Sequence, residues 1–381
     1  MDTLVNMMEK GVDDNVFPGA VLLVAKNSKI LFHKAFGRSD IYSNQRMTKE
    51  TIFDLASLTK PLATAMAVLK LIDNGVLDLD QTIGNMFDSL SDSLSDFTSE
   101  SIRNKLNNGK EKITINELLR HTSGFPGYRP YYQQLVKYPQ ILRRAFLRDL
   151  VIREPLVHKP GEKELYSDLG YILLAWIVEI FSSQRLDYFL REQVYRPLGI
   201  DALFFVDLHE HASCIDTSGV PDNHTAGKYF AATENCPWRK KLIKAEVHDD
   251  NAWAAGGIEG HAGLFGTAYA VFVLLTEVMS GLKGEKTKVI SGRLLREFVI
   301  KHGRGDRVAG FDTPSRPVSS SGRYFSASSV GHLGFTGTSF WIDPEKSVVV
   351  VLLTNRVHPS RNNEKIKEFR PLVHNCVMEG M

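Results

Sequence analysis

The chain has 381 residues, enough for one large domain or for two or three ordinary ones. Its 46 Lys and Arg residues nearly balance 44 Asp and Glu residues, and no basic block stands out. This balance argues against nucleic acid or an anionic membrane as the main partner. The three cysteines, Cys214, Cys236 and Cys376, are far apart and show no C-x-x-C spacing, which favours a reducing compartment over a disulfide framework.

The first ten residues contain acidic side chains and no apolar signal-peptide core. The longest apolar stretches are far below the ~20 residues that a membrane-spanning helix needs. We therefore expect a cytoplasmic protein without a membrane span, or a periplasmic one if a leader has been removed. The oligomeric state stays open.

The N-terminal part predicts a short amphipathic helix at residues 2–15 and then a β-hairpin at residues 20–25 and 30–37. A buried helix is expected after residue 57, and Gly75 occupies the left-handed position that commonly follows a helix. The two hairpin segments are rich in β-branched and aromatic residues, so they predict sheet rather than helix.

The middle of the chain predicts mainly helices. Residues 87–112 are rich in Ser, Asp and Asn and are expected to form an exposed loop. Helical patterns follow at residues 113–120, 130–158, 166–181 and 186–194, with no strand pattern among them. Towards the C-terminus, the sequence predicts helices at residues 268–279 and 363–378 and strands at residues 337–342 and 347–354.

This order indicates an α/β (α+β) fold in which one sheet draws on both ends of the chain. We expect residues 1–78 and 240–381 to form a discontinuous sheet domain and residues 79–239 to form a mainly helical domain. An active site would lie in the cleft between the two.

Ser57 and Lys60 are three positions apart, which places them on one helical face. Pro61 is tolerated only in a first helical turn, so Ser57 is predicted at the helix N-terminus, among unpaired N–H groups. A hydroxyl there, with an amine one turn on, is typical of an activated nucleophile. The alternative is a capping serine followed by a solvated lysine, since the S-x-x-K pattern is common by chance.

Tyr166 directly precedes a predicted buried helix, so its side chain could point into a cleft. A phenol is a poor base at its ordinary pKa of about 10. The ammonium of Lys60 would favour the phenolate and make Tyr166 a usable general base toward Ser57. The alternative is a half-buried tyrosine with a hydrogen-bonded hydroxyl.

Residues 331–338 read Gly-His-Leu-Gly-Phe-Thr-Gly-Thr and directly precede a predicted strand. Small residues would let a substrate backbone approach and pair with the edge of that strand. An N–H group of this segment, together with the N–H of Ser57, could form an oxyanion hole. The alternative is a glycine-rich turn with a solvated histidine, His332.

S-x-x-K at Ser57, Y-x-N/D at Tyr166 and [K/H]-x-G at His332, in this order, resemble the signature of serine β-lactamases and penicillin-binding proteins. Three further segments resemble the class C-like branch of that family: those around His121-Thr122-Ser123-Gly124, Pro160-Gly161-Glu162 and Gly337-Thr338-Ser339. This branch also contains D-alanyl-D-alanine carboxypeptidases, D-amino-acid peptidases and serine esterases. The resemblance covers residues 15–356.

The resemblance implies a β-lactamase/transpeptidase-like fold and no metal or cofactor. Ser57 would be the acylated nucleophile, and Lys60 and Tyr166 would be the proton-transfer pair. The backbone N–H groups of Ser57 and Phe335 would form the oxyanion hole. The residues expected to contact the substrate are Asp168, His332, Gly334 and Thr336.

Three positions depart from the family pattern. Asp168 replaces the usual asparagine, and Leu333 replaces a threonine whose hydroxyl would bind a substrate carboxylate. His332 replaces lysine, which is expected to make the charge of the site pH-dependent near neutrality. All three changes weaken recognition of the β-lactam carboxylate but leave acyl transfer intact.

Two other sequence patterns could indicate binding sites. The glycine-rich residues 256–263 lack the G-K-[ST] of a phosphate loop, so a loop lining the cleft is favoured. His248, Asp249 and Asp250 form an isolated cluster without the H-E-x-x-H pattern of zinc enzymes, so a structural role is favoured over a zinc site.

The sequence thus predicts a serine hydrolase that acts through an acyl-enzyme on a small molecule and not on nucleic acid. Candidate substrates are a β-lactam, a D-amino-acid peptide or muropeptide fragment, and a small ester. One alternative is a binding or sensor protein that is acylated but does not turn over, which the changes at Asp168 and Leu333 would favour. Another is metal-dependent hydrolysis.

Overall fold

The fold was analysed in a computed structural model of the chain. The structure describes residues 2–89, 106, 109–208, 229–300, 307–315 and 317–381. Most of the loop predicted at residues 87–112 lies outside these ranges, as does Cys214. The other two cysteines, Cys236 and Cys376, are free thiols.

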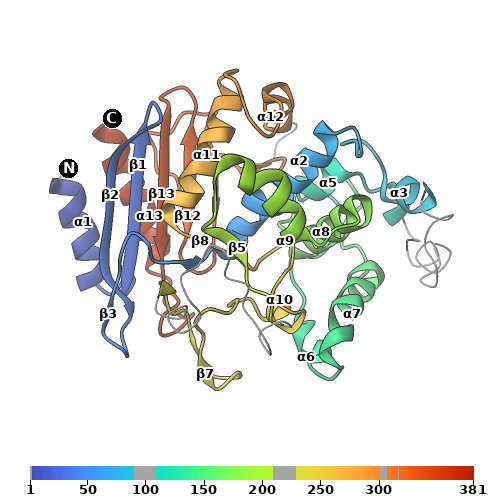
Figure 1. The fold of residues 1–381 in the computed structure, drawn as a ribbon, viewed down its shortest axis with the longest axis horizontal. Helices are drawn as coiled ribbons and strands as arrows, with labels where there is room; N and C mark the ends of the chain where they lie inside the picture. The colour runs from blue at the N-terminus through green and yellow to red at the C-terminus, as the bar shows by residue number, and fades with distance from the viewer. Residues whose placement is uncertain (1, 90–105, 107–108, 209–228, 301–306, 316) are drawn as a thin grey trace.

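An eight-stranded antiparallel sheet lies in the part of the molecule that carries both termini (Figure 1). In spatial order its strands are β3 (Gln45–Arg46), β2 (Lys29–Asp40), β1 (Gly19–Lys26), β13 (Val348–Thr354), β12 (Ser339–Asp343), β11 (Val330–Leu333), β10 (Phe311–Asp312) and β9 (Arg307–Val308). β1 pairs with β13 from Ala20, opposite Thr354, to Lys26, opposite Val348. The sheet therefore joins the two ends of the chain, which confirms the predicted fold class.

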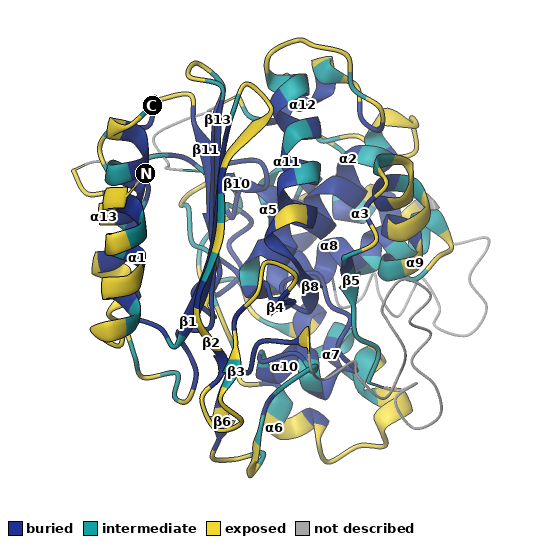
Figure 2. Ribbon diagram, turned by 60° about the vertical axis from the view of Figure 1, so that its left-hand side comes forward, coloured by how far each residue is buried: buried dark blue, intermediate teal, exposed yellow. Residues whose placement is uncertain are grey.

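Both faces of the sheet are covered by helices (Figure 2). Helices α1 (Asp2–Asp13) and α13 (Ile366–Glu379) pack on one face, and α11 (Ala268–Leu282) packs on the other. Successive strand residues point to opposite faces. Leu22 therefore belongs to the core under α1 and α13, whereas its neighbour Leu23 belongs to the core on the side of α11.

Most remaining helices lie beyond α11, on the side of the sheet away from both termini (Figure 1). They are α2 (Met66–Asp73), α3 (Ile83–Ser89), α5 (Ile115–Leu119), α6 (Tyr132–Leu135), α7 (Gln140–Arg153), α8 (Asp168–Ser182), α9 (Leu186–Leu190), α10 (Asp250–Ala254) and α12 (Gly292–Phe298). The apolar α8 contacts α2, α5, α7 and α9. No single described helix is long and apolar enough to cross a bilayer, although Asp168–Ser182 and Leu186–Leu198, bent by 72°, meet that criterion as a pair.

Two smaller sheets complete the fold. One contains β4 (Phe53–Asp54), β8 (Leu264–Gly266) and β5 (Leu203–Phe205), and the other contains β6 (Asn235–Cys236) and β7 (Lys241–Leu242). Strand β5 was not predicted; it follows the last of the helical segments predicted in the middle of the chain, which ends at residue 194. It is too short to give a clear alternating pattern. The domain boundaries at residues 78/79 and 239/240 stay a prediction.

The C-terminal strands correct one part of the sequence analysis. The segment that contains His332 is itself a strand, β11, and not the turn before one. β11 is also not the edge of the sheet, because β10 and β9 lie beyond it, although β10 pairs with β11 only between Asp312 and Gly331. The strand predicted at residues 337–342 is β12, which pairs with both β11 and β13, so the expected pairing of a substrate with its edge is wrong. A free edge exists only on β11, beyond its single pair with β10.

Two leucines of the β1–β2 hairpin provide a matched test of this packing. Leu23 is fully buried, whereas Leu31 is 45% exposed. Leu23→Ala should lower the free energy of unfolding by about 2–5 kcal/mol, because it removes buried methyl groups and leaves a cavity. Leu31→Ala should change it by less than about 0.5 kcal/mol. Urea unfolding measures both, and equal shifts would contradict the packing described.

Candidate active site

Ser57 lies on a tight turn that leads into α2. Residues Ala56–Leu58 form a 3₁₀ turn, and Lys60–Ala65 form a π-helical segment before the α-helix begins. Ala56 has a φ of +48°, a conformation that is unfavourable for a residue with a side chain. The carboxylate of Asp54 accepts a hydrogen bond of 2.8 Å from the N–H of Ala56 and so stabilises this backbone. Ser57 thus lies at the N-terminal end of a continuous helical run, as predicted, although the regular α-helix begins only at Met66.

Lys60 has no exposed surface. Its ammonium donates to Ser57 Oγ at 3.2 Å and to the carbonyl oxygen of His261 at 3.0 Å, and it lies 2.7 Å from Asp168 Oδ1. Burial alone would lower the pKa of Lys60, but the charge of Asp168 and the phenol of Tyr166 outweigh burial and raise that pKa above its ordinary value. Lys60 is therefore a charged ammonium at neutral pH.

Tyr166 lies against this ammonium, with its ring centroid 4.9 Å from Lys60 Nζ. Burial and, after it, the charge of Asp168 raise the pKa of Tyr166, and together they outweigh the lowering by the charge of Lys60 and by the side-chain hydrogen bonds with Lys60 and Ser57. Lys60 thus favours the phenolate, as expected, but the resting Tyr166 is a neutral phenol, which the expectation missed because it left out desolvation. The ring of His121 lies 4.5 Å from the tyrosine ring and is tilted by 32° to it, and the guanidinium of Arg307 lies 5.2 Å from the centroid of the tyrosine ring.

His332 faces the same site from β11, with its ring 6.1 Å from that of Tyr166. Its Nδ1–H donates to the carbonyl oxygen of Leu333 at 2.9 Å. Burial is the main cause that lowers the pKa of His332 to about 4, although Asp312 acts in the opposite direction. The prediction that its charge titrates near neutrality is wrong, because a buried imidazole is neutral throughout that range.

The loop after β11 is attached to the Ser57 turn. Thr336 Oγ1 donates to the carbonyl oxygen of Asp54 at 2.8 Å. A Cβ atom on Gly334 would lie only 2.7 Å from a backbone oxygen of that turn, so glycine is needed there. Among the described residues, the N–H groups of Ser57 and Phe335 donate to no protein acceptor. Both N–H groups are thus available to a substrate oxygen.

Residues 256–263 were expected to line the cleft, but none of them was predicted to be a site residue. The carbonyl of His261 is one of the three oxygens around Lys60, and Gly260 O accepts from Thr64 Oγ1 at 2.7 Å. A side chain on Gly260 would overlap the backbone of Tyr171 at 2.1 Å, so this loop depends on glycine for its close approach to α8. His261 Nε2 also lies 2.9 Å from Asp249 Oδ1, and their attraction lowers the pKa of Asp249 and raises that of His261 against the opposing effect of burial.

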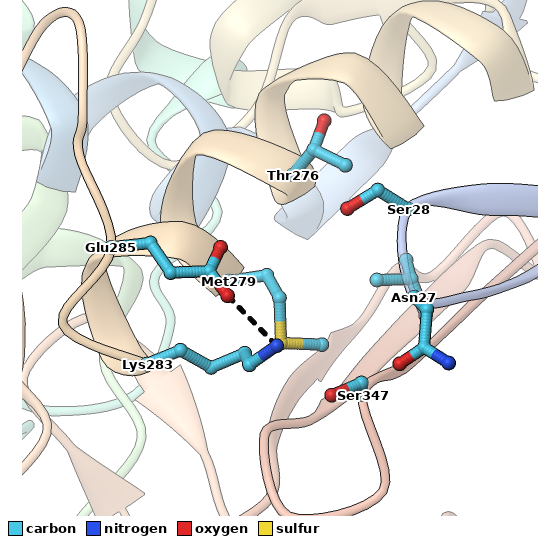
Figure 3. Close-up of a pocket in the computed structure, with 8 residues that line it drawn as sticks. Asn27, Ser28, Thr276, Met279, Lys283, Glu285 and Ser347 are labelled. Atoms are coloured by element: carbon cyan, nitrogen blue, oxygen red, sulfur yellow. Dashed lines mark ion pairs between the residues drawn. The ribbon is translucent and has the colours of Figure 1, made fainter.

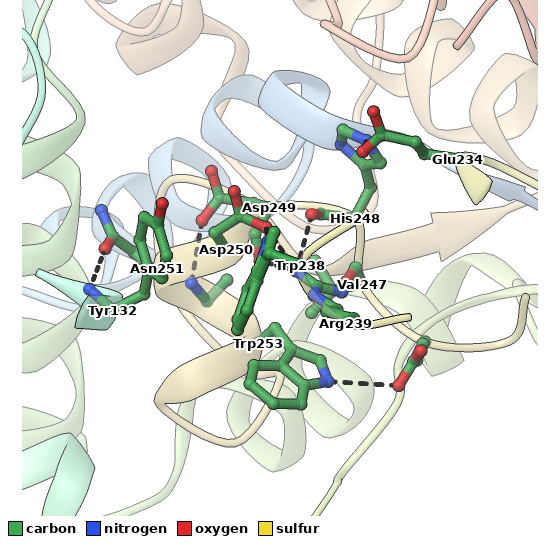
Figure 4. Close-up of polar contacts among 12 residues, drawn as sticks. Tyr132, Glu234, Trp238, Arg239, Val247, His248, Asp249, Asp250, Asn251 and Trp253 are labelled. Carbon is green, nitrogen blue, oxygen red and sulfur yellow. Dashed lines mark hydrogen bonds and ion pairs between the residues drawn. The ribbon is translucent and has the colours of Figure 1, made fainter. Parts of the chain in front are cut away.

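Arg239 organises the chain just before Asp249 (Figure 4). Its guanidinium donates to the carbonyl oxygens of Val247 at 2.8 Å and His248 at 2.9 Å. It is stacked against Trp238 at 5.2 Å and Trp253 at 4.7 Å. No sequence motif marks Arg239, so its role could not be predicted from the sequence.

The predicted cluster of His248, Asp249 and Asp250 is paired with other residues. His248 contacts Glu234 at 3.3 Å, and Asp250 pairs with Arg239 at 2.8 Å. Within the described parts of the chain, no three His, Cys, Asp or Glu side chains are arranged to hold a metal ion.

A pocket of about 130 Å³ lies elsewhere, where the β1–β2 turn meets the end of α11 (Figure 3). It is lined by Asn27, Ser28, Thr276, Met279, Lys283, Glu285, Ser347 and Val349. Lys283 and Glu285 form an ion pair of 2.8 Å beside it. It shares no residue with the group around Ser57.

Several solved structures have the same fold. The octameric penicillin-binding protein homologue from Pyrococcus abyssi is similar with a TM-score of 0.69 and 20% identity, over 98% of this chain and 77% of that one. Unliganded simvastatin synthase from Aspergillus terreus is similar with a TM-score of 0.68 and 18% identity, over 99% and 98% of the two chains. EstCE1, a hydrolase with promiscuous acyltransferase activity, is similar with a TM-score of 0.68 and 19% identity, over 97% and 98%.

Sequence comparison shows family membership in addition to the shared fold. A protein of Escherichia coli O157:H7 named "Putative D-alanyl-D-alanine carboxypeptidase" is 30% identical over 373 residues, which cover 93% of this chain and 82% of that protein. A protein of the same name from Salmonella schwarzengrund is 29% identical over 370 residues, with the same coverage. The sequence model of the family described as Beta-lactamase matches residues 4–374. The chain therefore belongs to the β-lactamase family, within the superfamily of serine hydrolases that includes the penicillin-binding proteins.

Proposed function

We propose that the protein hydrolyses a small amide or ester through an acyl-enzyme on Ser57. The observation that carries this proposal is the contact of Ser57 Oγ with the buried ammonium of Lys60 at 3.2 Å. A serine hydroxyl is a weak nucleophile unless a group beside it can take its proton. Lys60 and Tyr166 are the titratable groups in contact with that hydroxyl.

The proton balance of the site sets the order of the steps. At rest Lys60 is an ammonium and Tyr166 a neutral phenol, so the pair must first lose one proton to solvent. The singly protonated pair then accepts the proton of Ser57 while Oγ bonds to the substrate carbonyl carbon. The same pair returns this proton to the leaving group as its bond to carbon breaks. A water molecule, deprotonated by the pair, then releases the acid and restores Ser57.

During both halves of the reaction the carbonyl oxygen becomes negatively charged. We assign the N–H groups of Ser57 and Phe335 as the oxyanion hole, because neither has an acceptor in the described part of the chain and their loops are joined by Thr336.

The charges around the site favour a substrate without a carboxylate beside the scissile bond. His332 is neutral where the family usually has lysine. The charge of Arg307 is compensated by Glu164 at 2.6 Å and Asp312 at 2.9 Å, as that of Lys60 is by Asp168. The relatives' name points to D-alanyl-D-alanine peptides, and we propose neutral amides or esters of D-amino acids as the better substrates.

The alternative is an acylated binding protein that does not turn over, which the changes at Asp168 and Leu333 would favour. The ion pair between Lys60 and Asp168 keeps the lysine protonated, and this opposes proton transfer in acylation and in product release alike, so the ion pair does not distinguish the two functions. Turnover with a simple ester decides between the two functions.

Replacing Ser57 tests the nucleophile. Wild type should release p-nitrophenol from p-nitrophenyl acetate in a burst and gain one acetyl group by mass spectrometry, whereas Ser57→Ala should do neither. The exposed Ser328→Ala is the matched control and should resemble wild type. Steady release after the burst supports a hydrolase, a single turnover supports the binding protein, and loss of activity with a chelator would support metal-dependent hydrolysis. Equal labelling of wild type and Ser57→Ala would refute the assignment.

Replacing Asp168 tests the electrostatics. Asp168→Asn removes the charge that raises the pKa of Lys60, and burial then lowers this pKa. The acylation rate should rise with pH as the pair loses its proton. In the variant this rise is expected at a pH about 1–3 units lower than in wild type. The control is Asp149→Asn, which alters a pair with Arg153 on α7. A pH–rate profile that stays in place or moves to higher pH would contradict the proposed role.

Replacing His332 tests substrate preference. Wild type should cleave N-acetyl-D-Ala-D-Ala-amide faster than the free acid, as measured by kcat/KM. His332→Lys adds a charged donor, worth about 1.5–3 kcal/mol when it binds a carboxylate, so it should raise the acid-to-amide ratio about tenfold or more. His332→Gln, which stays neutral, should leave the ratio nearly unchanged. A wild type that prefers the free acid would exclude this explanation of specificity.

A further inference from the structure

Two guanidinium groups lie behind the loop that carries Phe335. They belong to Arg356 and Arg370, which are only 6% and 5% exposed. Within the described residues neither guanidinium lies at ion-pair distance from a carboxylate, although the charge of Glu364 acts on Arg356 from farther away. Burial, together with the charge of Arg356, lowers the pKa of Arg370 to about 9. Buried charges in proteins are ordinarily paired with an opposite charge, because an unpaired one is costly. Both charges are instead bound to backbone carbonyl groups.

Arg370 comes from α13, in the outer layer on the far face of the sheet. Its Nη2 donates to the carbonyl oxygens of Gly334 at 3.0 Å and Thr338 at 2.9 Å. The same carbonyl of Gly334 accepts from the N–H of Gly337 at 3.1 Å, and the N–H of Gly334 donates to Thr338 O at 2.8 Å. The guanidinium therefore binds both carbonyls of a closed turn, and its Nε has no partner among the described residues.

Arg356 supports the next peptide group of this turn. Its Nε donates to the carbonyl oxygen of Phe335 at 2.8 Å, and its guanidinium lies 4.5 Å from the centroid of the phenylalanine ring. Thr338 Oγ1 donates to the carbonyl oxygen of Leu55 at 3.1 Å, two residues before Ser57. Two positive charges thus lie on the carbonyl side of the turn, whose opposite side contacts the nucleophile turn.

The carbonyl of Gly334 and the N–H of Phe335 are the two ends of one peptide group. A hydrogen bond to the carbonyl end polarises the group and strengthens its N–H as a donor. A fixed, buried positive charge behind the peptide also favours the negative charge that develops on an oxygen bound to that N–H.

We propose that Arg370 is a positioning residue that orients and polarises the Gly334–Phe335 peptide, so that the Phe335 N–H binds the oxyanion formed at Ser57. The inference rests on the proposed function, since it needs Ser57 to be acylated. Arg370 itself contacts neither substrate nor reacting atoms. Its effect should therefore appear in stabilisation of the tetrahedral oxygen and not in binding of the neutral substrate.

The test compares Arg370→Met and Arg370→Lys with Lys110→Met. Lys110 is a matched control, because it is also a buried cation that donates to a backbone carbonyl, that of Ile152 at 2.5 Å in the helical part. Three quantities are measured: the acylation rate and the apparent KM with p-nitrophenyl acetate, and the inhibition constant of phenylboronic acid, which forms a tetrahedral anionic adduct with a serine.

Arg370→Met should lower the maximal acylation rate and the affinity for phenylboronic acid by the same factor, about tenfold, with KM changed less than about twofold. This effect is smaller than the 10²–10³-fold loss in kcat that follows when an oxyanion-hole donor is removed outright. Arg370→Lys, which keeps a charged donor, should restore both quantities to within about threefold of wild type. Lys110→Met should leave both at wild-type values.

A folded Arg370→Met protein with wild-type acylation and boronate affinity would overturn the inference, and so would a loss confined to KM. If Arg370→Met does not fold, Arg370→Gln, which keeps a neutral donor for one carbonyl, is judged by the same three quantities. Ser57→Ala separates the two proposals. If that variant is still acylated, the proposed function fails; if it is inert while Arg370→Met is unaffected, only the role of Arg370 fails.

Discussion

The buried ammonium of Lys60 is the constraint on which the site depends. A charge with no exposed surface requires compensation and hydrogen bonds. Its three oxygen partners come from separate parts of the chain: the Ser57 turn, Asp168 at the start of α8, and the backbone of His261 in the glycine-rich loop. Burying this one charge therefore requires the helical part, the nucleophile turn and that loop to meet at one point.

Asp54 makes a second connection of the same kind. Its carboxylate accepts from the N–H of Ala56 on one side and from the N–H of His248 at 2.6 Å on the other. The next residue, Asp249, reaches His261, whose carbonyl binds Lys60. The backbone conformation at Ser57 and the environment of Lys60 are thus set by one continuous network of polar contacts.

Sequence patterns predicted the long elements and the meeting of the site residues. The hairpin, α8, α11 and α13 have apolar runs long enough to show their period, and the order of the Ser57, Tyr166 and His332 motifs placed these residues in one site. Strand β11 was missed because it is short and contains Gly331 and His332. Protonation could not be predicted from residue type, since burial, a property of the folded chain, sets the pKa of Tyr166 and His332. Arg370 follows no motif and reaches the site only through the packing of α13 at the end of the sheet.

A crystal structure of the protein after reaction with a p-nitrophenyl phosphonate would test the central claim most directly. The account predicts phosphorus bonded to Ser57 Oγ, with one phosphonyl oxygen about 3 Å from the N–H groups of Ser57 and Phe335. Lys60 should still contact Asp168 in that adduct. Phosphorus bonded to another residue, or an oxygen directed away from both N–H groups, would contradict the account.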